Sequence, residues 1–206
     1  LALQASDLNR AEALLYRAVD IAAAADDAAL GVRVGIINGI WAVMSGQAAG
    51  REAILEIMRS APEHLDEIYS SGYSNLTYLD VEQRRLTDAA DLLDVSIRMT
   101  VERDLPVCRV WQIGSRARLR MLTGDWDDAV ADARQVLDER SALLARPWPL
   151  LVQGLVALRR DGGGADDLDN AWSLARRYGE PLRTLPAATA IVERAWLTGR
   201  SDEIGR

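Results

Sequence analysis

The sequence predicts an all-α fold, an α-α superhelix built from about five antiparallel helix pairs. Three observations support this prediction. Apolar residues recur at spacings of three and four along most of the chain. Signals for β-strands are nearly absent, because β-branched residues are scattered at helical spacing. Glycine, proline and aspartate residues divide the chain into segments of helix length.

In the first half of the chain, five helices follow from capping residues and apolar stripes. Their boundaries are marked by Asp7, Asp27, Gly46, Pro62 and Thr87-Asp88. The inner face of the first helix is predicted to include Leu14 and Val19, together with Ala11. The predicted ranges are about residues 7–25, 27–45, 50–60, 62–84 and 87–103.

In the second half, proline residues open helices and glycine residues end them. These boundaries are Pro106, Gly124-Asp125, Pro147 and Pro149, Asp161-Gly162-Gly163-Gly164, Asp166 or Asp167, and Gly199. The last helix starts after Pro181 or after Pro186, since either proline suits a first turn. The predicted ranges are about residues 106–122, 125–140, 148–160, 166–178 and 181 or 186 to 198.

A repeated pattern lies across these helices. Its clearest copy is Gly124-Asp125-Trp126-Asp127-Asp128-Ala129-Val130, in which a glycine ends one helix, acidic residues begin the next, and Ala129 lets the two approach closely. Weaker copies place small residues at Ala11, Ala53 and Ala89. The intervals are 42 (53 − 11), 36 (89 − 53) and 40 (129 − 89) residues, against about 34 in a tetratricopeptide repeat. The sequence therefore predicts one tetratricopeptide-like helical-repeat domain over residues 1–206; the alternative is a helical bundle without repeats.

Composition excludes several classes of function. The formal net charge is −7, and an acidic chain without a basic stripe is not expected to bind nucleic acid. Cys108 is the single cysteine, which favours a reducing, cytoplasmic location. Neither a membrane-spanning stretch nor a signal peptide is recognisable. The chain starts without Met, and residues 201–206 resemble the opening turn of another helix, so we expect a piece of a longer protein.

Residues 106–198 resemble one bacterial protein family. The similar segments are Arg116-Ala117-Arg118-Leu119 through Ala129, Leu168-Asp169-Asn170-Ala171-Trp172-Ser173-Leu174-Ala175, and Leu185-Pro186-Ala187-Ala188 through Gly199. They look like the helical-repeat sensor region of large ATP-binding LuxR-type (MalT-like) transcriptional regulators. The resemblance implies a nucleotide-binding module before the sensor and a DNA-binding helix-turn-helix after it. Neither can be placed on this sequence, which lacks a phosphate-binding loop and contains no Lys.

Catalytic and metal sites are not expected. His64 is the single histidine and has no Ser or Cys nucleophile at a diagnostic spacing, so we interpret it as a surface or capping residue. Cys108 lies beside inward-facing residues and is expected to be a buried or half-buried thiol. Acidic pairs such as Asp127-Asp128 lie where helices begin and complement the helix dipole. The sequence therefore predicts a protein that is not an enzyme and has no cofactor and no metal.

A binding face is the remaining candidate site. Arg109, Gln112, Arg116 and Arg120 follow one another at spacings of three and four, on one face of the predicted helix at 106–122. That face could line the concave side of a repeat array and bind an acidic partner or ligand. The alternative is a solvated face paired with Asp and Glu. Trp148 could face the same groove, whereas Trp126 and Trp196 are expected to pack at helix corners.

These observations predict a non-catalytic sensor or protein-interaction region of a LuxR-type regulator. It would bind a protein partner or a small-molecule effector, and DNA would be bound by a helix-turn-helix domain outside this sequence. The alternative function is a tetratricopeptide scaffold module attached to another signalling enzyme. Terminal repeats normally need a polar cap, so exposed end helices could also pair two copies in a homodimer.

Overall fold

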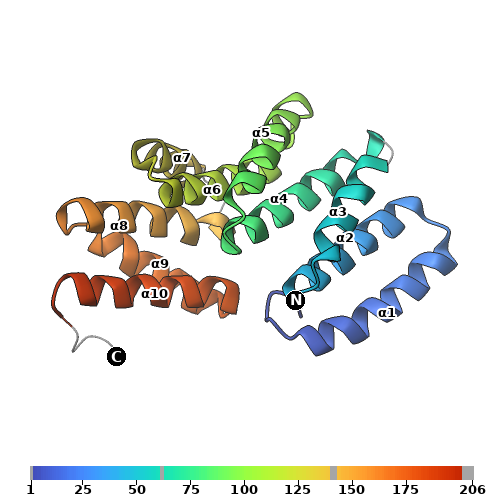
Figure 1. Ribbon diagram of the computed structural model, residues 1–206, viewed down its shortest axis with the longest axis horizontal. Coiled ribbons are helices and arrows are strands. Elements are labelled where there is room, and N and C mark those ends of the chain that lie inside the picture. The colour runs from blue at the N-terminus through green and yellow to red at the C-terminus, as the bar shows by residue number, and fades with distance from the viewer. Residues whose placement is uncertain (1, 61–62, 140–142, 201–206) are drawn as a thin grey trace. The chain divides into compact units, whose positions relative to one another are not determined.

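The computed structural model describes residues 2–60, 63–139 and 143–200. Over these ranges the chain forms α-helices and two short 3-10 helices, without a strand (Figure 1). Most helices that are adjacent in sequence pack against each other. The predicted all-α fold of antiparallel helix pairs is thus confirmed. The elements are α1 (Leu8–Ala25), α2 (Ala28–Met44), α3 (Ala49–Ser60), η1 (Glu63–Leu65), α4 (Asp66–Glu82), α5 (Leu86–Glu102), α6 (Pro106–Thr123), α7 (Trp126–Asp138), η2 (Leu143–Ala145), α8 (Pro147–Asp161), α9 (Ala165–Tyr178) and α10 (Pro181–Leu197).

The chain divides into two compact units, Leu1–Arg109 and Val110–Arg206. The boundary falls inside α6, so the first turn of that helix belongs to the first unit. Each unit has its own buried residues. The prediction of a single repeat domain over residues 1–206 stays a prediction.

The core of the first unit lies between α2, α3 and α4. Its buried side chains are Ile36, Ile40, Val43, Ile54, Leu65, Ile68, Tyr69, Leu76 and Leu79. The helices α2 and α3 approach most closely where two glycines, Gly39 and Gly50, face each other. A Cβ atom on Gly50 would lie 2.7 Å from Ala42 Cβ and 2.8 Å from the Val43 backbone nitrogen. The close approach therefore depends on the missing side chain at Gly50.

The core of the second unit centres on α8. Most of this helix is buried, from Pro147 to Leu158, because it packs against α7, α9 and α10. As in the first unit, glycines allow two helices, here α8 and α9, to approach closely. A Cβ atom on Gly154 would lie 2.6 Å from Leu168 Cδ2. Gly164, at the start of α9, has φ +74°, a left-handed conformation that glycine adopts without strain.

The buried positions in the first turns of alternate helices give a more regular repeat than the sequence indicated. We call α1, α3, α5, α7 and α9 the B helices, and α2, α4, α6, α8 and α10 the A helices. In the first turns of the B helices the buried positions are Ala11, Gly50, Ala89, Ala129 and Leu168. The intervals are 39 (50 − 11), 39 (89 − 50), 40 (129 − 89) and 39 (168 − 129) residues.

The choice of Ala53 as the small position of α3 is therefore wrong. Ala53 is exposed, whereas Gly50, three residues earlier on the same helix, is buried against α2. The physical reason is the pairing of Gly50 with Gly39, which brings the first turn of α3 closest to α2. Such pairing depends on the neighbouring helix and is absent from the local pattern around Ala53.

The ends of the A helices follow the same period. Each is followed within two residues by a residue with positive φ: Gly46, Arg84, Gly124, Gly162 and Gly199. The intervals are 38 (84 − 46), 40 (124 − 84), 38 (162 − 124) and 37 (199 − 162) residues. The positive φ reverses the chain direction after each A helix, which allows the next B helix to pack antiparallel to it.

Several local predictions need correction. Leu14 and Val19 were expected inside but are 47% and 46% exposed, because α2 covers the side of α1 that carries Ala11 and Leu15. Trp196 was expected at a packed corner but is 73% exposed. Of the two possible starts, α10 begins at Pro181, and Pro186 lies inside the helix. Pro62 and residues 201–206, which were assigned to helix starts, lie outside the described residues.

Candidate binding face on α6 and α7

The predicted arginine row lies on α6. Pro106 is the first residue of this helix, where its missing N–H costs no hydrogen bond, and the positive φ of Gly124 follows its last turn. Arg116 and Arg120 are one turn apart in the second unit. Their side chains are 25% and 29% exposed, so each guanidinium is partly withdrawn from water. Arg109 is half-buried and is the last residue of the first unit.

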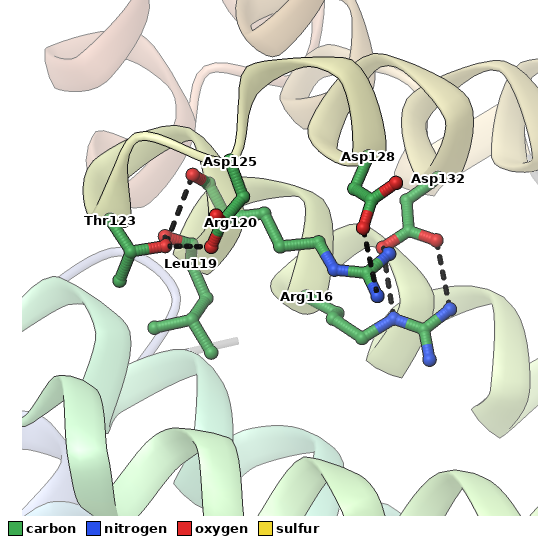
Figure 2. Close-up of polar contacts among 7 residues, drawn as sticks. All are labelled: Arg116, Leu119, Arg120, Thr123, Asp125, Asp128 and Asp132. Carbon is green, nitrogen blue, oxygen red and sulfur yellow. Dashed lines mark hydrogen bonds and ion pairs between the residues drawn. The ribbon is translucent and has the colours of Figure 1, made fainter.

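The guanidinium groups of Arg116 and Arg120 meet on one carboxylate, that of Asp132 in α7 (Figure 2). Arg116 donates from Nε to Asp132 Oδ2 at 2.9 Å and from Nη2 to Oδ1 at 2.8 Å. Arg120 donates from Nη1 to Oδ2 at 2.7 Å. The Asp132 side chain is 6% exposed. This bidentate, charge-assisted geometry is the strong form of an ion pair, and it fixes both arginines in place.

A second carboxylate lies at the outer edge of this cluster. Arg120 Nη2 is 3.8 Å from Asp128 Oδ2, and the Asp128 side chain is 69% exposed. At that distance and exposure the pair contributes little to stability. We call Arg116, Arg120, Asp128 and Asp132 the guanidinium face. Its inner carboxylate is held firmly and its outer carboxylate loosely.

The turn that joins α6 to α7 is fixed by polar contacts at the end of α6. Thr123 donates through Oγ1 to Asp125 Oδ2 at 2.9 Å, and the same oxygen lies 3.3 Å from the Leu119 carbonyl and 3.2 Å from the Arg120 carbonyl (Figure 2). Trp126 then donates from Nε1 to the Met121 carbonyl at 3.1 Å. These contacts set the position at which α7 starts, and so place Asp128 and Asp132 beside Arg120. They also support the predicted corner packing of Trp126, whose ring lies under Arg160.

Two of the five predicted residues lie in the core of the second unit and not on this face. Gln112 is fully buried. Trp148 is 8% exposed, at the first turn of α8, and the Arg118 guanidinium lies 5.0 Å from the centre of its ring. The structure thus brings Arg116 and Arg120 together on Asp132 and buries Gln112 and Trp148. Binding of a ligand by this set of residues stays a prediction.

Sequence reasoning missed Asp132, although a signal for it exists. On α7 the buried stripe is Ala129, Asp132, Ala133 and Val136. A carboxylate three residues after the small position Ala129 therefore falls on the face turned toward α6. A charged residue on an otherwise apolar helix face requires a partner. Arg116 and Arg120, which the sequence already groups on the facing helix, supply that partner.

The first unit contains a comparable buried carboxylate, Asp80 in α4. Arg51 of α3 donates from Nε to both Asp80 oxygens at 3.1 Å, and Arg85 Nη1 lies 3.9 Å from Asp80 Oδ1. Burial raises the pKa of the Asp80 carboxyl, and the nearby charge of Arg51 offsets part of that rise. Each unit therefore ties neighbouring helices together through a buried aspartate and two arginines.

The residues considered for catalysis, His64 and Cys108, belong to the first unit. His64 is exposed in η1, as expected for a surface histidine, and Cys108 is half-buried in the first turn of α6. Within the described ranges, no three His, Cys, Asp or Glu side chains are grouped so that they could hold a metal ion. Over those ranges, too, every helix is too short or too polar to cross a membrane.

No family model matches the chain, and comparison with curated proteins and with solved structures likewise gives no match.

Proposed function

We propose that this chain is a non-catalytic helical-repeat region that binds an acidic group of an effector or partner protein at the guanidinium face. The observation that carries the proposal is that the two arginines bind one carboxylate closely and the other only weakly. Asp132 receives hydrogen bonds from both arginines at 2.7 to 2.9 Å, whereas Asp128 lies 3.8 Å from Arg120 and is largely exposed. A carboxylate or phosphate of a ligand can replace Asp128 without disturbing Asp132.

The binding step is an exchange of one exposed anion for another. Asp132 holds the two guanidinium planes so that little side-chain freedom is lost when a ligand arrives. The ligand's anionic group takes the place of Asp128 at Arg120 and gains charge-assisted hydrogen bonds. The released Asp128 stays in water, which makes its displacement inexpensive in free energy.

The resemblance to LuxR-type regulators suggests a cellular role for this binding. We infer that the chain belongs to the sensor part of a LuxR-type regulator in the bacterial cytoplasm. An effector that binds one packing state of the helix pairs better than another shifts the population toward the state that activates transcription. The differential affinity of the effector for the two states sets the size of that shift.

The binding proposal can be tested on the purified chain by isothermal titration calorimetry. The probe is a synthetic oligoglutamate peptide, and an oligoglutamine peptide of the same length reports charge-independent binding. Arg120→Gln removes the charge that receives the ligand, and we expect about tenfold weaker binding, as for loss of one charge-assisted hydrogen bond. Arg134→Gln, an exposed site on α7, is the matched control and should bind as the wild type does. Equal affinity of Arg120→Gln and Arg134→Gln would contradict the proposal.

The regulator proposal has a separate test. The reading frame around this sequence should encode a phosphate-loop ATPase module upstream and a helix-turn-helix downstream. Charge reversal at Arg116 and Arg120 in that longer protein should then change the response of a reporter gene to its inducer. A frame that encodes a cyclase or kinase domain instead would favour the scaffold alternative, and an unchanged inducer response would exclude these arginines from sensing.

A further inference from the structure

Another arginine, Arg160 in the last turn of α8, pairs with the start of α7, which packs against α8. Arg160 donates from Nη2 to Asp127 Oδ1 at 2.8 Å, and the Asp127 side chain is 91% exposed. Asp127 directly precedes Asp128, the loosely held carboxylate of the guanidinium face. The first turn of α7 therefore carries two consecutive exposed carboxylates, and each is paired with an arginine of a different helix, α6 or α8.

Arg160 has a second contact, which does not involve a carboxylate. Its guanidinium lies 5.6 Å from the centre of the Trp126 ring, within the range of a cation–π interaction. The ring is itself held in place, because Trp126 Nε1 donates to the Met121 carbonyl at 3.1 Å. Arg160 can therefore keep its position over the ring when Asp127 turns away into water.

Arg120 and Arg160 share one arrangement of contacts. Arg120 is fixed by the buried Asp132 (Figure 2), and Arg160 is fixed by the Trp126 ring. For both arginines, the remaining partner is an exposed aspartate in the first turn of α7. Exposed ion pairs contribute little to stability, so either aspartate can be exchanged for an anionic group of a ligand. The fixed contacts hold the two guanidinium groups ready for that exchange.

Two other ion pairs of the second unit do not combine these properties. Arg159 binds Glu193 with two hydrogen bonds at 2.6 and 2.9 Å, and the Glu193 side chain is only 26% exposed. Arg194 binds Asp169 at 2.7 Å, but only 11% of the Arg194 side chain is exposed. A ligand would meet a firmly held carboxylate in the first pair and a covered guanidinium in the second. Exchange of anions is therefore favoured at the two arginines beside the start of α7.

We propose, as an extension that rests on the function proposed above, that the ligand is an acidic segment of a partner protein. Two acidic residues close together in that segment bind Arg120 and Arg160. Asp127 and Asp128 mimic such a segment, because their Cα atoms lie about 3.8 Å apart and their carboxylates reach both arginines at once. A small effector with a single anionic group engages only one arginine. Two linked groups bind more tightly, since the second contact forms at a high effective concentration.

Three synthetic peptides of equal length test this arrangement on the purified chain. They are oligoglutamate, oligoglutamine, and oligoglutamine with a single central Glu. Their dissociation constants are measured by NMR titration, which covers weak binding. Arg160→Gln should weaken the binding of oligoglutamate about fivefold, because the second acidic group loses its partner. The same variant should leave the binding of the single-Glu peptide within about twofold of the wild type, since one carboxylate can still bind at Arg120.

Control variants separate this effect from long-range attraction and from damage to the fold. Arg134→Gln removes the same charge at an exposed site of α7 and should bind both charged peptides as the wild type does. Asp127→Asn removes the competing carboxylate and keeps Arg160 over the Trp126 ring. It should strengthen the binding of oligoglutamate about twofold relative to Asp138→Asn, which removes the same charge at another exposed site of α7.

The outcomes distinguish this inference from the proposed function. If Arg120→Gln weakens the binding of oligoglutamate while Arg160→Gln binds it as Arg134→Gln does, the two-arginine site is overturned and binding at the guanidinium face stands. If Arg120→Gln also binds as Arg134→Gln does, both proposals fail. Equal losses of the two charged peptides in Arg160→Gln would overturn the two-arginine site as well, because a second acidic group would then make no contribution.

Discussion

Asp132 places a carboxylate where α7 otherwise presents small apolar side chains to α6. Both of its oxygens accept hydrogen bonds from guanidinium groups, so the cost of withdrawing it from water is offset by two arginines. Its neighbour Asp128 belongs to the same cluster but stays in water. The two aspartates lie one helical turn apart and differ mainly in burial, which makes them a matched pair for mutation.

Replacement of Asp132 by Ala should lower the free energy of unfolding by about 2 kcal/mol. The reason is that Arg116 and Arg120 would keep their half-buried positions without the carboxylate that neutralises them, and their partial exposure reduces the penalty expected for a fully buried pair. Asp128→Ala should change stability by less than about 0.5 kcal/mol. Urea unfolding of both variants measures the difference. Equal losses for the two would contradict the assignment of Asp132 as the central residue of the contact.

Asp80 gives a pH-dependent prediction in the first unit. Because burial raises its pKa above the ordinary value of 3.8, the folded protein binds this proton more tightly than the unfolded chain does. The stability contributed by this group is therefore highest below the ordinary value and falls as pH rises through the folded pKa. The Asn side chain in Asp80→Asn does not titrate, so this variant lacks that contribution to the pH dependence. The unfolding free energy of the wild type minus that of Asp80→Asn should fall as the pH rises above the ordinary value of 3.8; a constant or rising difference would be incompatible with the raised pKa.

At this scale the sequence indicated one half of each contact. The spacing of Arg116 and Arg120 singled them out, because residues three and four apart share a helix face. Their partner could not be read from the same spacing, because Asp132 lies on another helix and its burial depends on how α7 packs. Trp148 shows the same limit: the sequence left it open to a groove, and packing of α8 places it under Arg118.

Among the helices, close approach at glycine decides where pairs of helices meet. Gly50 and Gly39 bring α3 onto α2, and Gly164 and Gly154 bring α9 onto α8. The interiors at these points have no room for another carbon atom, since protein cores are packed as densely as organic crystals. Helix pairs of this kind are therefore sensitive to one added methyl group at the approach and tolerant of it elsewhere.

Gly50→Ala should lower the free energy of unfolding by about 1–3 kcal/mol, as overpacking does in other cores. The new Cβ atom would lie 2.8 Å from the backbone nitrogen of Val43, which cannot move away as a flexible side chain could. Gly31→Ala in α2 meets nothing within 4 Å and should raise stability by about 0.5–1 kcal/mol, because alanine loses less conformational entropy in a helix. Thermal or urea unfolding checks both signs, and a Gly50→Ala protein as stable as the wild type would refute the tight approach.

Most helix boundaries could be predicted from the sequence to within a residue or two. Asp27, for example, accepts a hydrogen bond from the Leu30 N–H at 3.1 Å, as expected for an N-cap. Prediction failed where a boundary depends on tertiary contacts. The short η1 helix precedes α4, and the small position of α3 is Gly50 and not Ala53. Local patterns carry caps and stripes, whereas the point of closest approach is decided by two helices together.

At the scale of the whole chain, one period relates the helices of both compact units. The buried first-turn positions of the B helices recur every 39 or 40 residues, and the positive-φ residues that follow the A helices recur every 37 to 40. The sequence predicted the repeat, but with intervals between 36 and 42, because the misplaced Ala53 lengthened one interval and shortened the next. The corrected register makes α1 a B helix and α10 an A helix.

The central functional claim is that an acidic ligand displaces Asp128 from Arg120. Asp128→Asn removes the competing carboxylate and leaves Arg116, Arg120 and Asp132 in place. Calorimetric titration of this variant with the oligoglutamate peptide is the most direct measurement. The claim predicts tighter binding, whereas damage to the fold could only weaken it. We expect affinity about threefold higher than that of the wild type, which corresponds to loss of a weak surface pair. Affinity equal to or lower than that of the wild type would contradict the claim.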